Sequence, residues 1–343
     1  MQKIALIGFG NVGQGLAEIL RTKKASLKRK QKYEFAVVAI SDFKLGSVYD
    51  PKGIDLKRAL EAVRKKGSLD AYKGGTHGWD AMTTIKKSKA DVVVELAYTD
   101  LATGQPAIGH CREALKRGMS VVTSNKGPAA LAYPALSRLA KKNKAHFFIE
   151  GTVMSGTPVL NVGMNDLAGN DFKSISGILN GTTNYMLSEM EKGMSYDAVL
   201  DKAQKLGYAE ADPTGDVEGI DAAGKVTILA NMFMDAKITP ADVRRRGITR
   251  LKPADIEMAK KGGKRWKLIG SVKRKKDGSI DASVRPVMLP LDDPLAGVMG
   301  PTNAVTFDTD LLGKVTVVGP GAGRIETGYS ILTDLLAIER SCS

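Results

Sequence analysis

The sequence contains few of the residues that build metal centres and redox motifs. Its cysteines, Cys111 and Cys342, match no metal-binding or redox spacing and indicate a reducing cytoplasm. Its histidines, His77, His110 and His146, form no metal-ligand or Ser/His/Asp spacing. We therefore interpret each histidine as an ordinary surface or core residue.

Long apolar runs and aromatic residues are also scarce. No apolar run is long enough to span a membrane, and the N-terminal stretch MQKIALIGFG enters a strand-like run without room for a signal peptide. Because only 6% of the residues are aromatic, aliphatic side chains and methionine must fill most of the core. We expect a cytoplasmic protein with no membrane partner.

Acidic residues are outnumbered by basic ones. The 51 Lys and Arg against 37 Asp and Glu give a formal net charge of +14, which raises the possibility of nucleic-acid binding. However, the basic runs KKASLKRKQK, VRKKG, KKGGKRWK and VKRKKDG lie far apart and carry few of the aromatic residues that single-strand binders use for stacking. We interpret the charge as a lysine-rich surface and expect no nucleic-acid partner.

The N-terminal stretch KIALIGFGNVGQGLAEIL carries a glycine fingerprint. An apolar run precedes Gly8, Gly10 and Gly13, and an amphipathic stretch follows. In a strand–turn–helix of this kind the glycines allow close backbone approach, and the helix N-terminus faces the pyrophosphate of a dinucleotide. The turn is therefore predicted to bind NAD or NADP through Gly8, Phe9, Gly10, Asn11, Val12 and Gly13.

Asp42 ends the second strand-like run, FAVVAISD, where an acid reads the adenosine ribose hydroxyls. A basic insert after the fingerprint lengthens the usual spacing to this acid. An acid here favours NAD because it repels a 2′-phosphate, but four basic residues between positions 44 and 58 can accept that phosphate. The cofactor preference stays open, and a loop-capping aspartate is the alternative interpretation.

Strand–helix alternation continues to about residue 150. The strand-like stretches ADVVVELAYT, MSVVTSNK and AHFFIEG alternate with helical stretches. This pattern predicts a Rossmann-type α/β fold, a doubly wound parallel sheet covered on both faces by helices. Ligands of such sheets bind beyond the carboxyl ends of the strands. Those ends carry Ala97, Tyr98, Thr99, Ser124 and Lys126.

The second half has glycine- and threonine-rich turns and then an acidic stretch, GYAEADPTGDVEGIDAAGK. We expect a helix that begins near Asp216, capped by Asp216 or Thr214. Asp221 and Lys225 are four residues apart and share a face of this helix. Because the following VTILANMFM is apolar almost all round, the helix is predicted to be buried. The pair then points into the interior or a cleft, where charges need a function; an exposed ion pair is the alternative.

Several of these motifs resemble those of homoserine dehydrogenases along essentially the whole chain. The matching stretches are GFGNVG, VVTSNK, GTVMSGTPV, GILNGTTNYML, LGYAEADPTGDVEGIDAAGK and GPGAG. The resemblance implies NAD(P)-dependent interconversion of L-homoserine and L-aspartate 4-semialdehyde in threonine and methionine biosynthesis, by a homodimer. The departures are modest, such as SNK where many members have ANK. We expect a short, monofunctional form, without room for a regulatory or kinase domain.

The resemblance also assigns residues. It implies catalytic roles for Lys126 and Lys225, and substrate binding by Glu210, Asp216, Asp221, Thr182 and Gly181. A loop that holds a monovalent cation in some members matches Glu150, Val153, Ser155 and Thr157.

Three segments are expected. They are a dinucleotide-binding domain over 1–150, an α+β domain for substrate binding and dimerisation over 151–312, and a strand and helix over 313–343 that return to the first domain. Gly323 is then expected near the cofactor. Two other functions stay open: a dehydrogenase of another small amino acid such as aspartate, and a non-catalytic nucleotide-binding protein.

Overall fold

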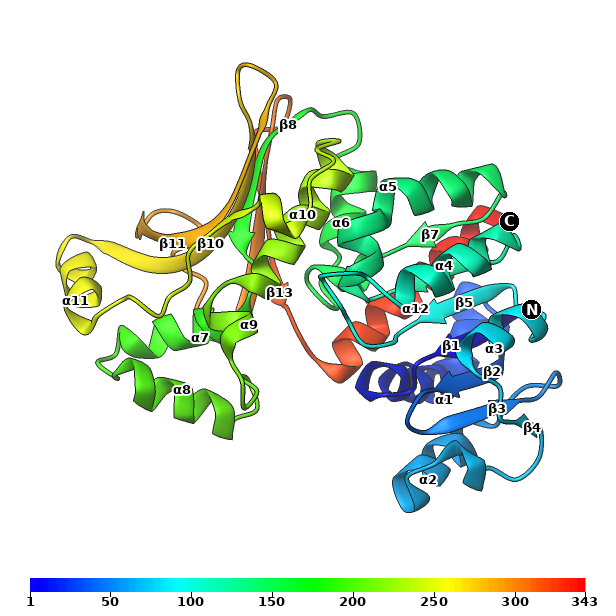
Figure 1. The fold of residues 1–343 in the computed structure, drawn as a ribbon. Helices are drawn as coiled ribbons and strands as arrows, with labels where there is room; N and C mark the ends of the chain where they lie inside the picture. The colour runs from blue at the N-terminus through cyan, green and yellow to red at the C-terminus, as the bar shows by residue number, and fades with distance from the viewer. Residues whose placement is uncertain (343) are drawn as a thin grey trace. The chain divides into compact units, whose positions relative to one another are not determined.

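The computed structural model describes residues 1–342 and divides into two compact units (Figure 1). The first unit comprises Met1–Gly156 together with the C-terminal segment from Gly323, and the second comprises Thr157–Ala322. In Figure 1 the first unit runs from blue to green and ends in red, and the second runs from green to orange.

The first unit contains a seven-stranded sheet in the order β4-β3-β2-β1-β5-β6-β7. Neighbours from β2 to β7 pair in parallel, whereas β3 and β4 form an antiparallel edge. The predicted Rossmann-type sheet is confirmed, with β1 next to β2 and β5, as the alternation of strands and helices indicated. The strands are β1 (Gln2–Ile7), β2 (Phe35–Asp42), β3 (Gly46–Tyr49), β4 (Thr76–His77), β5 (Val92–Glu95), β6 (Ser120–Thr123) and β7 (Phe147–Phe148).

Helices pack in two groups in this unit. Helix α1 packs against α2 and α12, and α4 packs against α3 and α5. At one close approach, a Cβ on Gly328 of α12 would lie 2.8 Å from the backbone nitrogen of Leu16 in α1, so only glycine fits between these helices. The helices are α1 (Asn11–Gln31), α2 (Leu56–Lys66), α3 (Ala81–Lys87), α4 (Ala107–Lys116), α5 (Lys126–Lys142) and α12 (Arg324–Cys342).

The second unit is built on a six-stranded sheet in the order β13-β12-β8-β10-β11-β9. Its long strands pair antiparallel, and β8 lies between β12 and β10. The strands are β8 (Phe172–Ile178), β9 (Arg244–Arg245), β10 (Lys264–Arg274), β11 (Ile280–Pro290), β12 (Thr302–Thr309) and β13 (Lys314–Pro320). The helices are α6 (Val159–Asn161), α7 (Gly181–Met190), α8 (Tyr196–Lys205), α9 (Thr214–Val217), α10 (Ile220–Phe233) and α11 (Pro253–Lys261).

Helix α10 confirms the predicted buried helix, because its residues from Ala222 to Asn231 are buried. Its predicted start near Asp216 is wrong. A short helix, α9, covers 214–217 behind Pro213, and Gly219 then adopts φ 74° before α10 begins at Ile220. A residue in the left-handed conformation ends the helical path of α9 and lets α10 begin along a new axis. Glycine adopts this conformation at little cost in free energy.

The C-terminal segment is shared between the units. Strand β13 pairs with β12 in the second sheet, whereas α12 belongs to the first unit and packs against α1. The last residue of the predicted segment 313–343 lies outside the described part of the chain.

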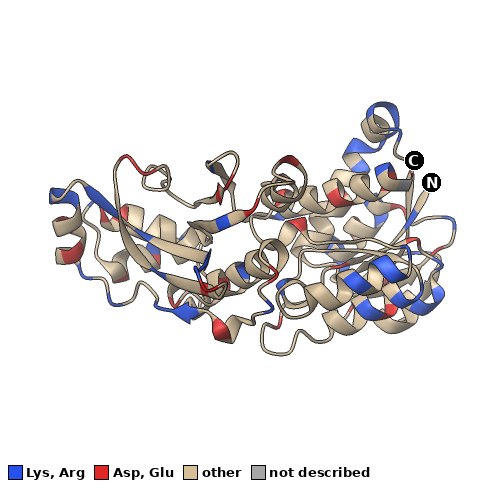
Figure 2. Cartoon of the chain, turned by 90° about the horizontal axis from the view of Figure 1, so that it is seen from above, with Lys and Arg blue, Asp and Glu red and all other residues tan. Residues whose placement is uncertain are grey.

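Basic residues are spread over helices and strands of both units, with acids among them (Figure 2). None of the helices within residues 1–342 is long and apolar enough to cross a membrane.

Candidate active site

The glycine turn between β1 and α1 is shaped for close approach of an anion. Gly8 has φ 101°, and a Cβ there would lie 2.5 Å from the carbonyl oxygen of Leu96. By contrast, a Cβ on Gly10 would meet no atom within 4 Å. Gly10 is also the N-cap of α1, and no acidic residue lies in the first turn. The helix N-terminus therefore offers free space and the positive end of a helix dipole, which suit an anion such as a pyrophosphate.

Phe9 and its neighbours take different positions around this turn. The ring of Phe9 is fully buried in the core of the first unit, so only its backbone belongs to the turn. Val12 packs against the same core, whereas Asn11 is exposed. A Cβ on Gly13 would lie 2.6 Å from the carbonyl oxygen of Gly8, which explains why the third position is also glycine.

Asp42 ties the end of β2 to the glycine turn. Its Oδ2 accepts a hydrogen bond from the Phe9 amide at 2.7 Å, and its Oδ1 accepts from the amides of Lys44 and Leu45 at 2.9 and 3.0 Å. Asp42 therefore caps its own loop, as the alternative interpretation held, and it does so beside the dinucleotide turn. The half-buried carboxylate also keeps a negative charge at the carboxyl end of β2.

Asn125 organises the carboxyl ends of β5 and β6, although no role was predicted for it. Its Nδ2 donates to the carbonyl oxygens of Ala97 and Tyr98, each at 3.0 Å, and its Oδ1 caps α5 by accepting from the Gly127 amide. The signal that would have identified it is an asparagine directly before a helix that follows a buried strand. Thr99 and Tyr98 are exposed beyond β5.

Lys126 is the first residue of α5 and follows Ser124 and Asn125. A cation at a helix N-terminus opposes the helix dipole, so this position is electrostatically unfavourable for a purely structural lysine. The side chain is half-buried at the carboxyl end of β6.

Buried polar side chains contact one another at the carboxyl ends of β5 and β6. Glu95, the last residue of β5, is fully buried, and its Oε1 lies 3.3 Å from His110 Nδ1. The Thr123 hydroxyl donates to the Glu95 carbonyl oxygen at 2.7 Å and accepts from the Asn125 amide at 2.9 Å. Sequence analysis treated His110 as an ordinary core residue, and the structure confirms that it is buried.

The residues suggested for a monovalent cation fall in both units. Glu150, Val153 and Ser155 are buried in the first unit, and Ser155 has φ 51° with its Oγ 2.7 Å from Thr327 Oγ1. Thr157 belongs to the second unit, where its Oγ1 donates to the Pro320 carbonyl oxygen at 2.9 Å. Across the described chain, no three His, Cys, Asp or Glu residues gather as metal ligands.

In the second unit, Lys225 and Asp221 form the predicted pair on α10. The Lys225 Nζ lies 2.8 Å from Asp221 Oδ2 and donates to the Leu179 carbonyl oxygen at 2.7 Å. The pair is not an exposed one, because only 8% of the Lys225 side chain and 19% of the Asp221 side chain are accessible. Of the two interpretations of this pair, the structure supports the buried one.

Asp216 joins this pair through Asn180, the N-cap residue of α7. Asn180 Nδ2 donates to Asp216 Oδ1 at 2.6 Å and to Asp221 Oδ2 at 3.2 Å. Burial raises the pKa of Asp216, the negative charge of Asp221 raises it further, and hydrogen bonding to Asn180 opposes the shift. Two carboxylates and one ammonium thus converge at the N-terminal end of α7. Asn180 lies in the GILNGTTNYML motif, but sequence analysis assigned it no role.

The other acidic residues of this stretch differ in their contacts and exposure. Asp212 Oδ1 accepts from the Thr214 amide and holds its own loop, whereas Glu218 Oε1 accepts from the hydroxyl of Thr249, in the segment that follows β9. Glu210 is exposed. Next to it, the carbonyl oxygen of Tyr208 accepts a hydrogen bond from the hydroxyl of Thr182, which links the Glu210 loop to the first turn of α7.

The remaining predicted glycines lie at tight positions. A Cβ on Gly181, the first residue of α7, would lie 2.6 Å from the Pro301 carbonyl oxygen. Gly323 has φ 140°, and its carbonyl oxygen accepts from Thr327 in the first turn of α12. Both positions therefore require glycine for backbone reasons, independent of any ligand.

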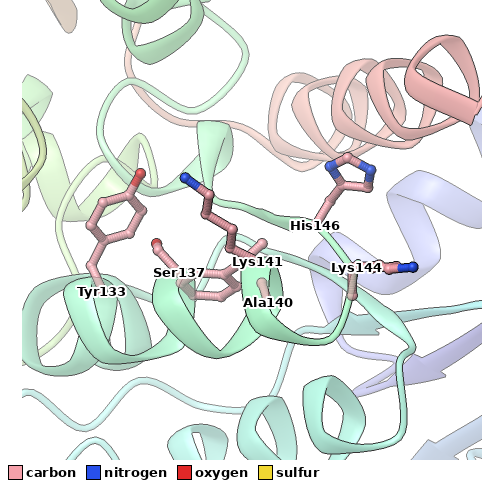
Figure 3. A pocket seen from close by; sticks show the side chains of 8 residues that line it. Tyr133, Ser137, Ala140, Lys141, Lys144 and His146 are labelled. Carbon is pink, nitrogen blue, oxygen red and sulfur yellow. The ribbon is translucent and has the colours of Figure 1, made fainter.

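One hollow, of about 420 Å³, lies along α5 and contains none of the predicted site residues (Figure 3). Tyr133, Ser137 and Lys141 line it from α5, and Lys144 and His146 from the segment that follows. Burial raises the pKa of Tyr133, which keeps its hydroxyl protonated. The hollow has neither the glycine turn nor the acids of the second unit, so it does not compete with them as the active site.

Comparison with known proteins decides the family. The description "Homoserine dehydrogenase, NAD binding domain" matches residues 8–150, and "Homoserine dehydrogenase" matches residues 158–336. An NAD(+)-dependent homoserine dehydrogenase of Pseudomonas canavaninivorans is 45% identical, over 99% of this chain and 97% of its own length. The chain belongs to the homoserine dehydrogenase family.

Other relatives agree. A homoserine dehydrogenase of Methanocaldococcus jannaschii is 44% identical over 98% of both chains. A hyperthermophilic archaeal homoserine dehydrogenase solved in complex with NADPH is 32% identical, with a TM-score of 0.84, over 99% of this chain and 98% of that one. Membership in the homoserine dehydrogenase family makes the chain an NAD(P)-dependent oxidoreductase that interconverts L-homoserine and L-aspartate 4-semialdehyde. It also decides against the two alternative functions.

Proposed function

We propose that the acidic stretch and α10 supply the residues that bind the amino acid and transfer its proton. In this assignment Glu210 and Asp216 bind the substrate ammonium, and Thr182 and Gly181 in the first turn of α7 hold the remaining polar groups. Opposite charges and the N-terminal end of a helix suit the two charged ends of an amino acid.

The observation that carries the proposal is the environment of Lys225. An ammonium has three N–H donors, and among the described residues Lys225 directs two of them to Asp221 and to the Leu179 carbonyl. The third can donate to the oxygen of a substrate. Because Asp221 balances its charge, a lysine can be buried here without an uncompensated cation.

The chemistry balances in both directions. The bound nicotinamide supplies a hydride to the aldehyde carbon of aspartate semialdehyde, or accepts it from the alcohol carbon of homoserine. As the aldehyde is reduced, negative charge develops on its oxygen, and Lys225 donates a proton to that oxygen. In the reverse direction the same amine accepts the alcohol proton.

The cofactor is assigned to the first unit. We infer that the pyrophosphate binds at Gly8–Gly13, that Asp42 meets the adenosine ribose, and that Ala97–Thr99, Ser124, Lys126 and Gly323 lie on the nicotinamide side. The negative charge of Asp42 makes NAD the preferred cofactor, because a 2′-phosphate would meet repulsion there.

Three further assignments belong to the same proposal. Residues 1–150 form the dinucleotide-binding domain, and the second unit serves both substrate binding and homodimer formation. A monovalent cation is held by the segment from Glu150 to Thr157, using carbonyl and hydroxyl oxygens. The enzyme works in the cytoplasm.

A steady-state assay tests the proposed specificity. Oxidation of NADH and NADPH is followed with aspartate semialdehyde, and with oxaloacetate plus ammonia as the control substrate. We expect turnover with aspartate semialdehyde only, and a higher kcat/KM with NADH than with NADPH. A higher kcat/KM with NADPH would contradict the role given to Asp42.

A further inference from the structure

Lys267, on β10 in the second unit, is a fully buried lysine outside the proposed chemistry. Lysine is rarely buried because its ammonium loses its hydration, so a buried one needs protein acceptors. Burial lowers the pKa of Lys267 to about 8, the positive charge of Arg265 lowers it further, and Glu191 opposes the shift. The protein therefore retains a costly group where an apolar side chain would fit the core better.

The acceptors of Lys267 show what the ammonium does. Its Nζ donates to Asn184 Oδ1 at 2.9 Å and to the Val298 carbonyl oxygen, and it lies 3.6 Å from the sulfur of Met299. These groups come from α7 and from the segment 298–302, which connects to β12. One ammonium therefore joins three parts of the unit: strand β10, helix α7 and this segment.

Asn184 extends the connection. Because an ammonium only donates, the amide oxygen of Asn184 must face Lys267, which leaves its Nδ2 to donate to backbone carbonyls. The Nδ2 lies 3.1, 2.9 and 3.0 Å from the carbonyl oxygens of Val298, Gly300 and Thr302, and Val298 is thus shared with Lys267. The Gly300 amide in turn donates to Ser188 Oγ at 3.1 Å. Lys267 thus fixes the orientation of the amide that holds the whole segment to α7.

The segment reaches the proposed substrate site through Pro301. The Pro301 carbonyl oxygen packs on Gly181, where even a Cβ would come within 2.6 Å. Gly181 follows Asn180, which hydrogen-bonds both Asp216 and Asp221. A shift of the segment would therefore move the N-terminal end of α7 and the acids bound to it.

We propose that Lys267 is a positioning residue for the substrate: by holding the segment 298–302 against α7, it sets the place of Asn180, Gly181 and Thr182. The inference rests on the substrate role proposed for this turn of α7. The opposing interpretation is that Lys267 only stabilises the core of the unit, without effect on the affinity for the substrate.

The test is the kinetics of Lys267→Met, which keeps the length of the stem and removes all three donors. Couplings through packed networks are worth roughly 0.5–2 kcal/mol, so we expect KM for homoserine to rise roughly 2- to 30-fold at about 1.36 kcal/mol per decade. The Kd for NAD should stay unchanged, because the glycine turn belongs to the other unit. Lys273→Met, an exposed lysine on the same strand, is the matched control and should leave both values unchanged. A Lys267→Met KM within twofold of wild type, measured well below the melting temperature, would overturn the proposal.

Two more variants keep the test decisive. If Lys267→Met does not fold, Ser188→Ala removes the hydrogen bond by which α7 holds Gly300. A raised KM supports the proposal, and an unchanged KM contradicts it. Thr182→Val distinguishes failure of the substrate assignment from failure of the positioning role. If it leaves KM unchanged, the substrate assignment itself fails; if it raises KM while Lys267→Met does not, only the positioning role fails.

Discussion

At the scale of single residues, charges are placed where they carry a cost to folding. Lys126 begins a helix, Asp216 is a partly buried carboxylate beside another acid, and Lys225 is buried on α10. Each position is unfavourable for a structural charge. Charged groups at such positions are more frequent in binding and catalytic sites than elsewhere in a protein.

Asp42 allows the first test. Asp42→Ala removes three backbone contacts from the loop beside the glycine turn, and it also removes a charge from the ribose position. We therefore expect weaker binding of both cofactors, with a larger loss of affinity for NAD than for NADP. The loss for NADP is smaller because the variant no longer repels its 2′-phosphate. Titration of the two cofactors by fluorescence measures both Kd values. Equal losses would show that Asp42 acts on the loop alone.

Asp216 allows a test that uses pH. Because its pKa is raised in the folded protein, the folded state holds this proton more tightly than the unfolded chain, and stability is lost as pH rises through the folded pKa. Asp216→Asn keeps an acceptor for Asn180 and removes this cost. The variant should be at least as stable as wild type at pH 7, with an advantage that shrinks towards pH 4, while KM for homoserine rises by tenfold or more.

Thermal unfolding at several pH values, together with steady-state kinetics, checks both parts of this prediction. A destabilised Asp216→Asn protein with a normal KM would mean that Asp216 is structural.

At the scale of elements, interruptions of the backbone bring the site residues together. The acidic stretch forms two helices, α9 and α10, that meet at Gly219. Sequence patterns predicted α10, its burial and the Asp221–Lys225 pair, because helical periodicity and the apolar run are local signals. They did not predict the break, because a glycine in a helical pattern is often tolerated and only its packing shows that it adopts a left-handed conformation.

Gly219→Ala tests the importance of this break. The new methyl group would be held at φ 74° and would lie 2.9 Å from Val284 Cγ1. Strained backbone positions of this kind cost roughly 1–3 kcal/mol, so we expect a lower melting temperature and a raised KM for homoserine, because Asp216 moves relative to Asp221. Gly263→Ala is the control, since Gly263 has φ 64° and an added Cβ there would meet nothing within 4 Å.

Denaturant unfolding compares the two glycine variants. If both variants lose a similar amount of stability and KM is unchanged in Gly219→Ala, the substitution acts through backbone strain alone. The break at Gly219 would then have no role in placing Asp216.

At the scale of the whole molecule, the sequence predicted the Rossmann-type sheet better than the path of the C-terminal segment. The glycine turn and the strand ends follow from local patterns, and the acidic motif follows from family resemblance. The segment 313–343 was expected to return to the first domain. Helix α12 lies in the first unit and packs on α1, whereas β13 pairs in the second sheet, through contacts between distant residues. Asn180 and Lys267 were missed because their roles appear through partners far away in the sequence. Asn125 was missed although its position before a helix is a local signal.

The central claim is that Lys225, on α10 of the second unit, transfers the proton of the reaction. Lys225→Met keeps the apolar stem and removes the transferable proton. General acid–base catalysis is typically worth about 10²–10⁴-fold, so we expect kcat to fall by about that factor, with the Kd for NAD little changed. Lys126→Met should also slow turnover, and the double variant should lose less than the product of the two single losses, because both lysines serve one reaction.

The decisive measurement is kcat of Lys225→Met beside Lys205→Met. Lys205 pairs with Asp201 at 2.6 Å in the same i,i+4 arrangement, but in solvent, so its replacement should leave kcat unchanged. We predict a folded Lys225→Met protein that binds NAD normally and turns over at least a hundredfold more slowly than wild type. A folded Lys225→Met enzyme with kcat within a few-fold of wild type would contradict the assignment.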